Sequence, residues 1–229
     1  MTAGALLLRV ACKKAGIAPR LRAILNKAGT GAMSFRFLDG HAEGSIRLPT
    51  GQTALINPCL GATGSAMEVI DGIARVFCPC EETEGMTIAF LQAGESLRTD
   101  RLCSEGVCVE AITPLLFRSL SNGQPGQGVD PVNEWTLQLL RIRHLGSAEQ
   151  RLHALLGLLV NRMGRRCGDW CVLPFRLKHE RIAELIGTTR VTATKLLSSL
   201  RVSEQLHTPA QAPGLWLAPE LIAAAPLTA

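Results

Sequence analysis

The stretch of sequence that decides the fold is residues 179–200, HERIAELIGTTRVTATKLLSSL. Residues 180–186 have the apolar periodicity of an amphipathic helix, and residues 189–200 show the same periodicity again. Gly187 lies between the two patterns, and glycine commonly ends a helix in the left-handed conformation. Two short helices joined by such a turn form a helix-turn-helix, whose second helix enters the major groove of DNA. We therefore predict that residues 189–200 form a recognition helix.

The predicted second helix has two distinct faces at 100° per residue. One face gathers the apolar residues Ala193, Leu196, Leu197 and Leu200, which are expected to be buried. The opposite face carries Val191, Lys195 and Ser198, flanked by Arg190 and Thr194. An exposed valine has no structural purpose there, but in a groove it could pack on a thymine methyl group, while Arg190 could reach guanine O6 and N7.

The candidate DNA contacts fall into two groups, because base contacts specify a sequence and phosphate contacts position the protein. The candidate DNA contacts on the recognition helix are Arg190, Val191, Thr192, Thr194, Lys195 and Ser198. The candidates for phosphate contacts are Thr188, Thr189, Lys178, His179 and Arg201, and an ordinary surface position is the alternative for His179. Thr188 or Thr189 also suits the N-cap of the second helix.

The charge of the chain is concentrated around this motif. The whole chain carries a formal net charge of +5, yet residues 162–201 contain nine Lys/Arg against three Asp/Glu. A basic block in an otherwise neutral protein is expected of a phosphate-binding surface, and a solvated helical surface is the alternative.

No apolar run reaches the ~18 residues that cross a bilayer, so we expect no membrane association. Residues 3–10 are too short for a signal peptide, and we expect a cytoplasmic protein with reduced cysteines.

The sequence before the motif divides into three parts. Residues 1–44 form a helical lead-in, with the best helical pattern over residues 21–27. Residues 45–120 show short apolar segments separated by glycines, which is typical of a small β-barrel or roll. The predicted strands are residues 46–48, 53–56, 67–70, 73–77, 86–91 and 107–112.

Residues 121–164 are predicted to contain a linker followed by two helices. In the first helix Trp135, Leu139 and Ile142 form a stripe, which suits a dimer partner or the protein's own barrel. The second helix starts at a capping box made by Ser147 and Gln150. Residues 165–229 complete a winged helix-turn-helix domain, whose two-stranded wing comprises residues 205–208 and 215–217 and contains no Lys or Arg.

Residues 182–197, IAELIGTTRVTATKLL, resemble the helix-turn-helix of the Crp/Fnr regulators. The Thr-Arg-Val-Thr core is most similar to that of the cyanobacterial global nitrogen regulators. The resemblance implies an α+β fold with a cyclic-nucleotide-binding-like β-roll, a long dimerisation helix and a C-terminal winged helix-turn-helix. It also implies a homodimer that reads a palindromic promoter site, with Arg190, Val191 and Lys195 at the base-contacting positions. Lys178 departs from the family, which usually has a Ser or Thr cap there.

The sensor part departs further from the family. Cyclic-nucleotide binders carry a Gly-Glu-Leu-Ala-type segment followed by Arg-(Ser/Thr/Ala)-Ala, whereas residues 93–101, AGESLRTDR, are shortened and lack the second element. We therefore expect a nutrient-responsive regulator that does not use cyclic AMP. Arg98 and Arg101 are candidate ligands of a small acidic effector such as 2-oxoglutarate, and solvation of both arginines is the alternative. RNA polymerase is a further candidate partner.

Other functional classes have weaker support in the sequence. The eight cysteines offer a redox, metal or Fe–S sensor as an alternative, but their spacings match no common metal site. We therefore predict no metal and no cofactor. The five histidines fall in no metal or triad motif, so we predict that the chain is not an enzyme. A winged helix that serves protein interaction without binding DNA is the remaining alternative.

Overall fold

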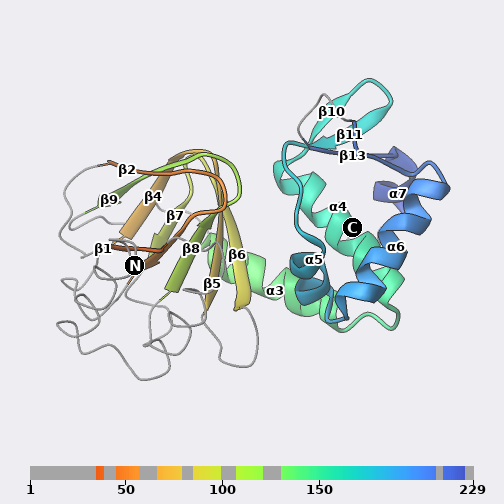
Figure 1. The fold of residues 1–229 in the computed structure, drawn as a ribbon, viewed down its shortest axis with the longest axis horizontal. Coiled ribbons are helices and arrows are strands. Elements are labelled where there is room, and N and C mark those ends of the chain that lie inside the picture. Colours follow the sequence, from red (N-terminus) through yellow and green to blue (C-terminus); the bar gives the residue numbers. More distant parts are fainter. Residues whose placement is uncertain are drawn as a thin grey trace, which may run out of the picture. The chain divides into compact units, whose positions relative to one another are not determined.

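The computed structural model forms two compact units, Met1–Asn133 and Glu134–Ala229, and has the predicted α+β class (Figure 1). The residues it describes are 35–38, 45–56, 66–78, 85–98, 107–120, 130–209 and 214–224. Within these ranges, no helix combines the length and apolar character required to span a membrane.

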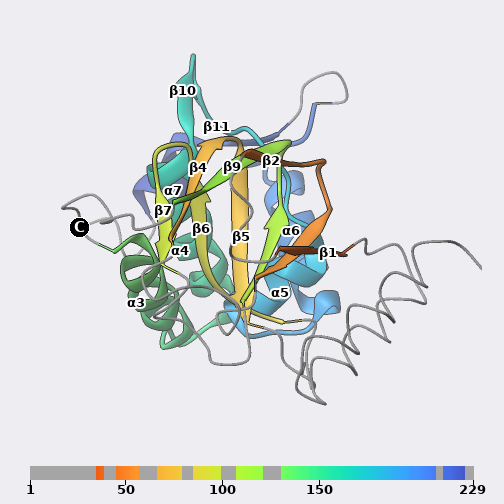
Figure 2. The same ribbon diagram turned by 90° about the vertical axis from the view of Figure 1, so that its left-hand side faces the viewer.

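The described residues of the first unit between Phe35 and Leu120 form two β-sheets (Figures 1 and 2). The five-stranded sheet has the order β1-β3-β8-β5-β6, with β1 parallel to β3. Its strands are β1 (Phe35–Leu38), β3 (Thr53–Ile56), β5 (Ile73–Cys78), β6 (Met86–Gln92) and β8 (Val107–Ala111). The four-stranded sheet has the order β2-β9-β4-β7. Its strands are β2 (Ser45–Leu48), β4 (Ala66–Asp71), β7 (Ser96–Arg98) and β9 (Leu115–Leu120).

The space between the two sheets is filled by apolar side chains. Ala74, Leu91 and Val109 of the five-stranded sheet border the same narrow space as the side chains of the other sheet. The residues that the four-stranded sheet contributes are Met67, Val69, Leu97, Leu115 and Phe117. All eight are buried, as expected for two sheets whose inner faces form one core.

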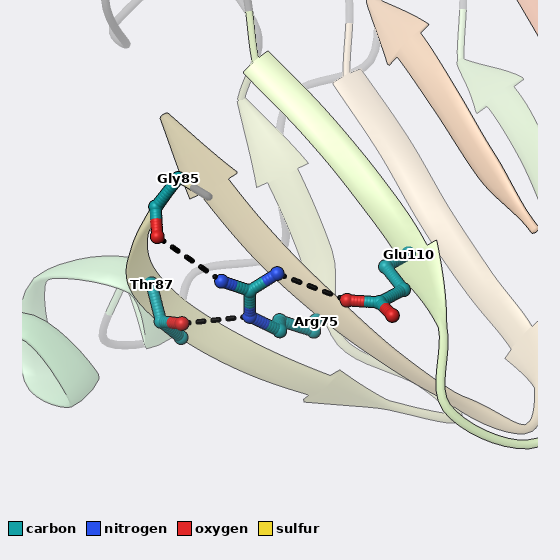
Figure 3. Close-up of polar contacts among 4 residues, drawn as sticks. All are labelled: Arg75, Gly85, Thr87 and Glu110. Carbon is teal, nitrogen blue, oxygen red and sulfur yellow. Dashed lines mark hydrogen bonds and ion pairs between the residues drawn. The ribbon is translucent and has the colours of Figure 1, made fainter. Parts of the chain in front are cut away.

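A charged pair is buried on the other face of the five-stranded sheet (Figure 3). Successive residues of a strand point to opposite faces, so Arg75 points away from the side that Ala74 occupies. Arg75 Nη1 donates to Glu110 Oε2 at 2.9 Å, and Arg75 Nε donates to Thr87 Oγ1 at 2.7 Å. Arg75 Nη2 donates to the Gly85 carbonyl at 3.3 Å. Hydrogen bonds therefore compensate the burial of this guanidinium.

Gly85 has to be a glycine for this cluster to close. Its φ is +104°, and a Cβ atom there would lie 2.3 Å from Cδ2 of Phe77. The ring of Phe77 in turn lies under the guanidinium of Arg75, 4.2 Å from ring centroid to Cζ. A side chain at position 85 would therefore displace the ring against which the buried cation packs.

The six predicted strands are all present, each within two residues of its predicted bounds. Strands β1, β7 and β9 were not predicted. Strand β1 corrects the expectation of a helical lead-in for residues 35–38, whereas residues 1–34 and 39–44 lie outside the described part of the chain. Strand β7 has only three residues, and β9 (LLFRSL) lacks strict alternation, so pairing with distant strands defines both of them.

The second unit is built around a central helix, α4 (Ala148–Met163), which contacts α5, α6, α7 and β11. The predicted capping box starts this helix: Ser147 Oγ accepts from the Gln150 N–H at 3.1 Å, and Gln150 Oε1 accepts from the Ser147 N–H at 3.2 Å. The remaining helices are α3 (Pro131–Arg143), α5 (His179–Ile186), α6 (Arg190–Val202) and α7 (Pro219–Ala223).

A four-stranded antiparallel sheet of order β10-β11-β13-β12 completes the second unit. Its strands are β10 (Arg165–Cys167), β11 (Trp170–Leu173), β12 (Leu206–His207) and β13 (Leu215–Leu217). The predicted wing is therefore present as the pair of β12 and β13. It is joined to a hairpin of β10 and β11, which was not predicted.

Candidate nucleic-acid interface

The predicted turn of the helix-turn-helix lies between α5 and α6. Gly187 ends α5 in the left-handed conformation, with φ 63° and ψ 51°, and the Thr188 N–H donates to the Ala183 carbonyl at 2.9 Å. Arg143 Nη2 of α3 donates to the Glu184 carbonyl at 2.6 Å, which places a cation at the C-terminal end of α5. Both contacts fix the direction in which the chain leaves α5 and enters α6.

The recognition helix α6 begins at a threonine N-cap. Thr189 is the capping residue, and its Oγ1 accepts from the Thr192 N–H at 3.2 Å. The two hydroxyl oxygens of Thr189 and Thr192 lie 3.0 Å apart. Two of the predicted DNA-contact residues therefore also hold the first turn of α6. By contrast Lys178, the N-cap of α5, makes no capping hydrogen bond with its side chain, which is the departure that the sequence indicates.

The two faces of α6 match the angular prediction with one exception. Ala193, Leu197 and Leu200 are buried, whereas Leu196 is half-buried. Val191 is 64 % exposed. Lys195 and Ser198 are exposed as well, so the predicted base-reading side of the helix is open to solvent.

Arg190, the first residue of α6, forms an ion pair with Glu180 in the first turn of α5. The distance from Arg190 Nε to Glu180 Oε1 is 2.9 Å, and the two side chains are 69 % and 38 % exposed. Glu180 is not among the site residues predicted from the sequence. The two residues are ten positions apart, so only the packing of α5 against α6 brings them together.

His179 and Thr194 form a second polar contact between α5 and α6. Nδ1 of His179 lies 2.8 Å from Oγ1 of Thr194, and the same hydroxyl donates to the Arg190 carbonyl at 2.9 Å. Because the single hydroxyl proton goes to that carbonyl, the imidazole nitrogen is the donor in the first contact. Thr194 is thus held within the helix pair, although it was predicted to face DNA.

Fewer cations of the basic block, residues 162–201, are available to a ligand than the sequence indicates. Arg181 is only 4 % exposed, and Arg162 is ion-paired with Glu134. The exposed cations of the helix-turn-helix are Lys178, Arg190, Lys195 and Arg201. His179 is half-buried and borders, together with Arg201, a hollow of about 150 Å³ beneath the helices.

Arg176 joins the wing to the segment that precedes α5. Its Nε donates to the Gly214 carbonyl at 2.8 Å, and its Nη2 donates to the Pro209 carbonyl at 2.7 Å. Gly214 has a φ of +112°, and a Cβ atom there would lie 2.1 Å from the Leu173 carbonyl oxygen. Arg176 therefore orients the base of the wing, a structural role that its position in a basic block did not indicate.

The candidate effector residues of the roll are only partly described. Arg98 is half-buried at the end of β7, opposite Ala66 in β4, and Arg101 lies outside the described residues. The described cysteines are Cys78, Cys108, Cys167 and Cys171, and their thiols are not in disulfides. Within the described ranges, no group of three or more His, Cys, Asp or Glu side chains could hold a metal ion. The other four cysteines lie outside these ranges.

Two family models and several curated relatives match the chain. Residues 46–132 match the cyanobacterial CRP family N-terminal domain, and residues 150–208 match the Crp-like helix-turn-helix domain. The regulatory protein CysR of Synechococcus elongatus is 40 % identical over 145 residues, which cover 61 % of this chain and 70 % of the relative. The chain belongs to the Crp/Fnr family of transcription regulators. It is a transcription regulator with a helix-turn-helix DNA-binding domain, and its family is not one of enzymes.

Other Crp/Fnr proteins are similar over shorter stretches or in fold alone. The global nitrogen regulator of Nostoc sp. is 38 % identical over 73 residues, which cover 32 % of this chain and 31 % of the relative. A CRP/FNR-family regulator from Thermus thermophilus shares the fold, with a TM-score of 0.59 at 17 % identity, over 80 % of this chain and all of that one. A mutant of CooA from Carboxydothermus hydrogenoformans does so with a TM-score of 0.59 at 20 % identity, over 78 % of this chain and 84 % of that one.

Proposed function

We propose that this Crp/Fnr regulator binds a palindromic DNA site as a homodimer and reads it with α6 in the major groove. The observation that carries the proposal is the exposed side of α6, where Val191 is 64 % exposed between the cations Arg190 and Lys195. Exposing an apolar β-branched side chain to water stabilises nothing in the free protein. A thymine methyl group beside guanine acceptors would satisfy all three side chains.

The candidate contacts separate into those that read bases and those that hold the backbone. Arg190, Val191 and Lys195 are assigned to bases, supported by their common exposed side of α6. Thr192 and Ser198 flank them, whereas the Thr194 hydroxyl already has two partners within the protein. Residues that surround this side are assigned to phosphates, which position the protein without specifying sequence. They are Lys178, His179, Thr188, Thr189 and Arg201.

The homodimer is supported by an exposed apolar seam on α3. Trp135, Leu139 and Ile142 form the apolar stripe that was predicted to pack either on a dimer partner or on the protein's own barrel. All three residues are buried within this single chain. Leu137 and Leu140 instead are each 54 % exposed on the other side of α3. Exposed Asn133 and His144 extend them to the 4-3-4 spacing of a coiled-coil seam (residues 133, 137, 140 and 144). Burial of these leucines against a second copy of α3 is the arrangement we propose.

Independence from cyclic AMP is supported by the interior of the roll. Among the residues that the structure describes, those that border the narrow space between the two sheets are apolar, from Met67 of β4 to Phe117 of β9. A cyclic phosphate placed among them would lose its hydration without gaining a cation, at a large cost in free energy. We retain Arg98 and Arg101 as candidate ligands of a small acidic effector, with 2-oxoglutarate as the compound to test.

Selection of bound duplexes from random DNA tests the proposed function. The wild-type chain should enrich a palindrome with a guanine in each half-site. Arg190→Ala should weaken binding to the selected duplex by ~1–3 kcal/mol, because the forked contact with guanine is lost. Fluorescence anisotropy with the selected and a random duplex measures both affinities, and repeating the titrations with cyclic AMP and with 2-oxoglutarate tests the effector.

The matched control is Arg166→Ala, which removes an equal charge from an exposed residue of β10. It should affect the selected and the random duplex alike, since a charge acting on phosphates carries no sequence preference. Base readout by α6 is refuted if Arg190→Ala and Arg166→Ala behave in the same way.

A further inference from the structure

The carboxylate of Glu180 lies on the side of the helix-turn-helix that is proposed to face a polyanion. Its Oε1 atom is 2.9 Å from Nε of Arg190, and 38 % of the side chain is exposed. A carboxylate near phosphates opposes binding to any DNA. The ion pair with Arg190 gives Glu180 a role in binding that can offset this repulsion.

We propose that Glu180 is a positioning residue that orients the Arg190 guanidinium for the recognition of guanine. This inference rests on the proposed function, because it names the residue that sets the specificity of that interface. Glu180 does not touch the base itself. It determines which edge of Arg190 is presented to the groove, and therefore how strongly α6 prefers guanine at that position of the half-site.

The geometry of the pair leaves the correct edge of the arginine available. Glu180 engages Nε, and no other partner of the guanidinium is found within residues 130–209 and 214–224. The terminal edge, formed by Nη1 and Nη2, can then donate two parallel hydrogen bonds to guanine O6 and N7. An arginine whose Nε is already held has fewer rotamers to lose when it meets the base, which favours the specific complex.

The scaffold that carries Glu180 is fixed relative to α6. The neighbouring residue His179 bonds the Thr194 hydroxyl at 2.8 Å, and that hydroxyl bonds the Arg190 carbonyl at 2.9 Å. The left-handed turn at Gly187 joins the C-terminal end of α5 to the N-terminal end of α6. The backbone that carries Glu180 is therefore held against the backbone of Arg190, as a positioning role requires.

Two effects of Glu180 on DNA affinity are distinguishable by their sign. As a positioning residue it strengthens binding to the guanine-containing duplex, whereas as a simple negative charge it weakens binding to every duplex. Only the positioning effect changes the ratio of specific to random binding, because a charge acting on phosphates affects every duplex alike. The absolute affinity for the selected duplex and its dependence on Arg190 also separate the two effects.

The test uses the full chain and the duplex selected by the wild type, together with the same duplex carrying adenine in place of the guanine and a random duplex. Glu180→Ala should weaken binding to the selected duplex by roughly threefold to tenfold. This loss is a part of the discrimination against other bases that a forked arginine–guanine contact provides. Its affinity for the random duplex should stay unchanged or rise. Glu180→Gln keeps an acceptor for Nε and should restore most of the preference for guanine over adenine.

A double-mutant cycle with Arg190→Ala assigns the effect to the ion pair. In the Arg190→Ala background, Glu180→Ala should no longer weaken binding to the selected duplex. Glu149→Gln is the matched control, because it removes one exposed carboxylate from the first turn of α4 and should leave the guanine preference intact. Thermal melting should show every variant folded, since an exposed ion pair contributes little to stability.

Two results would overturn the inference while leaving the proposed function standing. One is tighter binding of Glu180→Ala to the selected and random duplexes alike, which would make Glu180 a repulsive charge only. The other is an equal loss of affinity with and without Arg190, which would place the action of Glu180 elsewhere. If the wild-type chain enriched no sequence at all, the proposed function itself would fail, and the role of Glu180 with it.

Discussion

Cys108 of β8 has an almost fully buried thiol, with 2 % of the residue exposed. Burial raises the pKa of Cys108 to about 12, although the nearby guanidinium of Arg75 acts in the opposite direction. The folded chain therefore keeps this proton at a pH at which an unfolded chain has released it. Below the ordinary thiol pKa of 9.0 both states are protonated, and burial of the thiolate has no effect on stability.

Alkaline pH should consequently destabilise the first unit through Cys108. Between about pH 9 and pH 12 the site should reduce the free energy of unfolding by up to ~1.4 kcal/mol per pH unit, because only the unfolded state ionises. Urea unfolding at pH 8 and pH 10, monitored by circular dichroism, measures this loss. Cys108→Ala is the comparison and should lose less stability over the same range. The chain contains no tyrosine, which removes one group that would titrate there. Equal losses in both proteins would contradict the prediction.

The DNA-contact residues show which parts of a site the sequence can predict. The exposure of Val191 follows from helix geometry alone, and the structure confirms it. The ion pair of Glu180 with Arg190 and the hydrogen bonds of Arg176 to the wing join residues from different elements. No local sequence pattern predicts these contacts, because the sequence of a basic block does not distinguish a charged residue that contacts DNA from one that holds a loop in place.

At the scale of elements, α3 carries two apolar faces with different uses. One face is buried in its own chain, and the guanidinium of Arg162 lies 5.4 Å from the centroid of the Trp135 ring on that face. The other face presents Leu137 and Leu140 to solvent. Amphipathic periodicity identified the first face, whereas the second became evident only from the exposure of the leucines, because they interrupt the polar side of the pattern.

The exposed face of α3 makes the homodimer testable. Leu137→Glu combined with Leu140→Glu should convert the dimer to a monomer, since a pair of carboxylates would be buried against its symmetry mate. Light scattering coupled to gel filtration measures the mass directly. Gln138→Glu with Arg141→Glu adds acidic residues to neighbouring positions of the same helix and should leave the dimer largely intact. A double leucine variant that still eluted as a dimer would exclude this seam as the interface.

At the scale of the whole molecule, the chain contains two compact units whose stabilities can be followed separately. The three tryptophans, Trp135, Trp170 and Trp216, all lie in the second unit. Tryptophan fluorescence therefore follows the unfolding of the second unit, and far-ultraviolet circular dichroism follows both. The buried Arg75–Glu110 pair belongs to the first unit, which makes it a probe of that unit alone.

Arg75→Met should destabilise the first unit by ~3–5 kcal/mol, because it removes the guanidinium that is ion-paired with Glu110 while the carboxylate stays buried. Urea unfolding monitored by circular dichroism should then show an early transition, while the transition in tryptophan fluorescence keeps its midpoint. The double variant Arg75→Met with Glu110→Leu removes both charges and should recover much of the stability. An equal shift of both signals in Arg75→Met would show that the two units unfold as one.

The sequence alone determined the elements whose signals are local. These are the capping box at Ser147, the left-handed Gly187, the threonine cap of α6 and the apolar faces of the helices, together with the family to which they belong. Each depends on residues a few positions apart, whose geometry the backbone dictates. Tertiary structure alone decided which cations are free, which leucines are exposed, and which carboxylate holds Arg190. Those properties depend on how distant segments pack, and one side chain in the same local sequence can be buried in one packing and exposed in another.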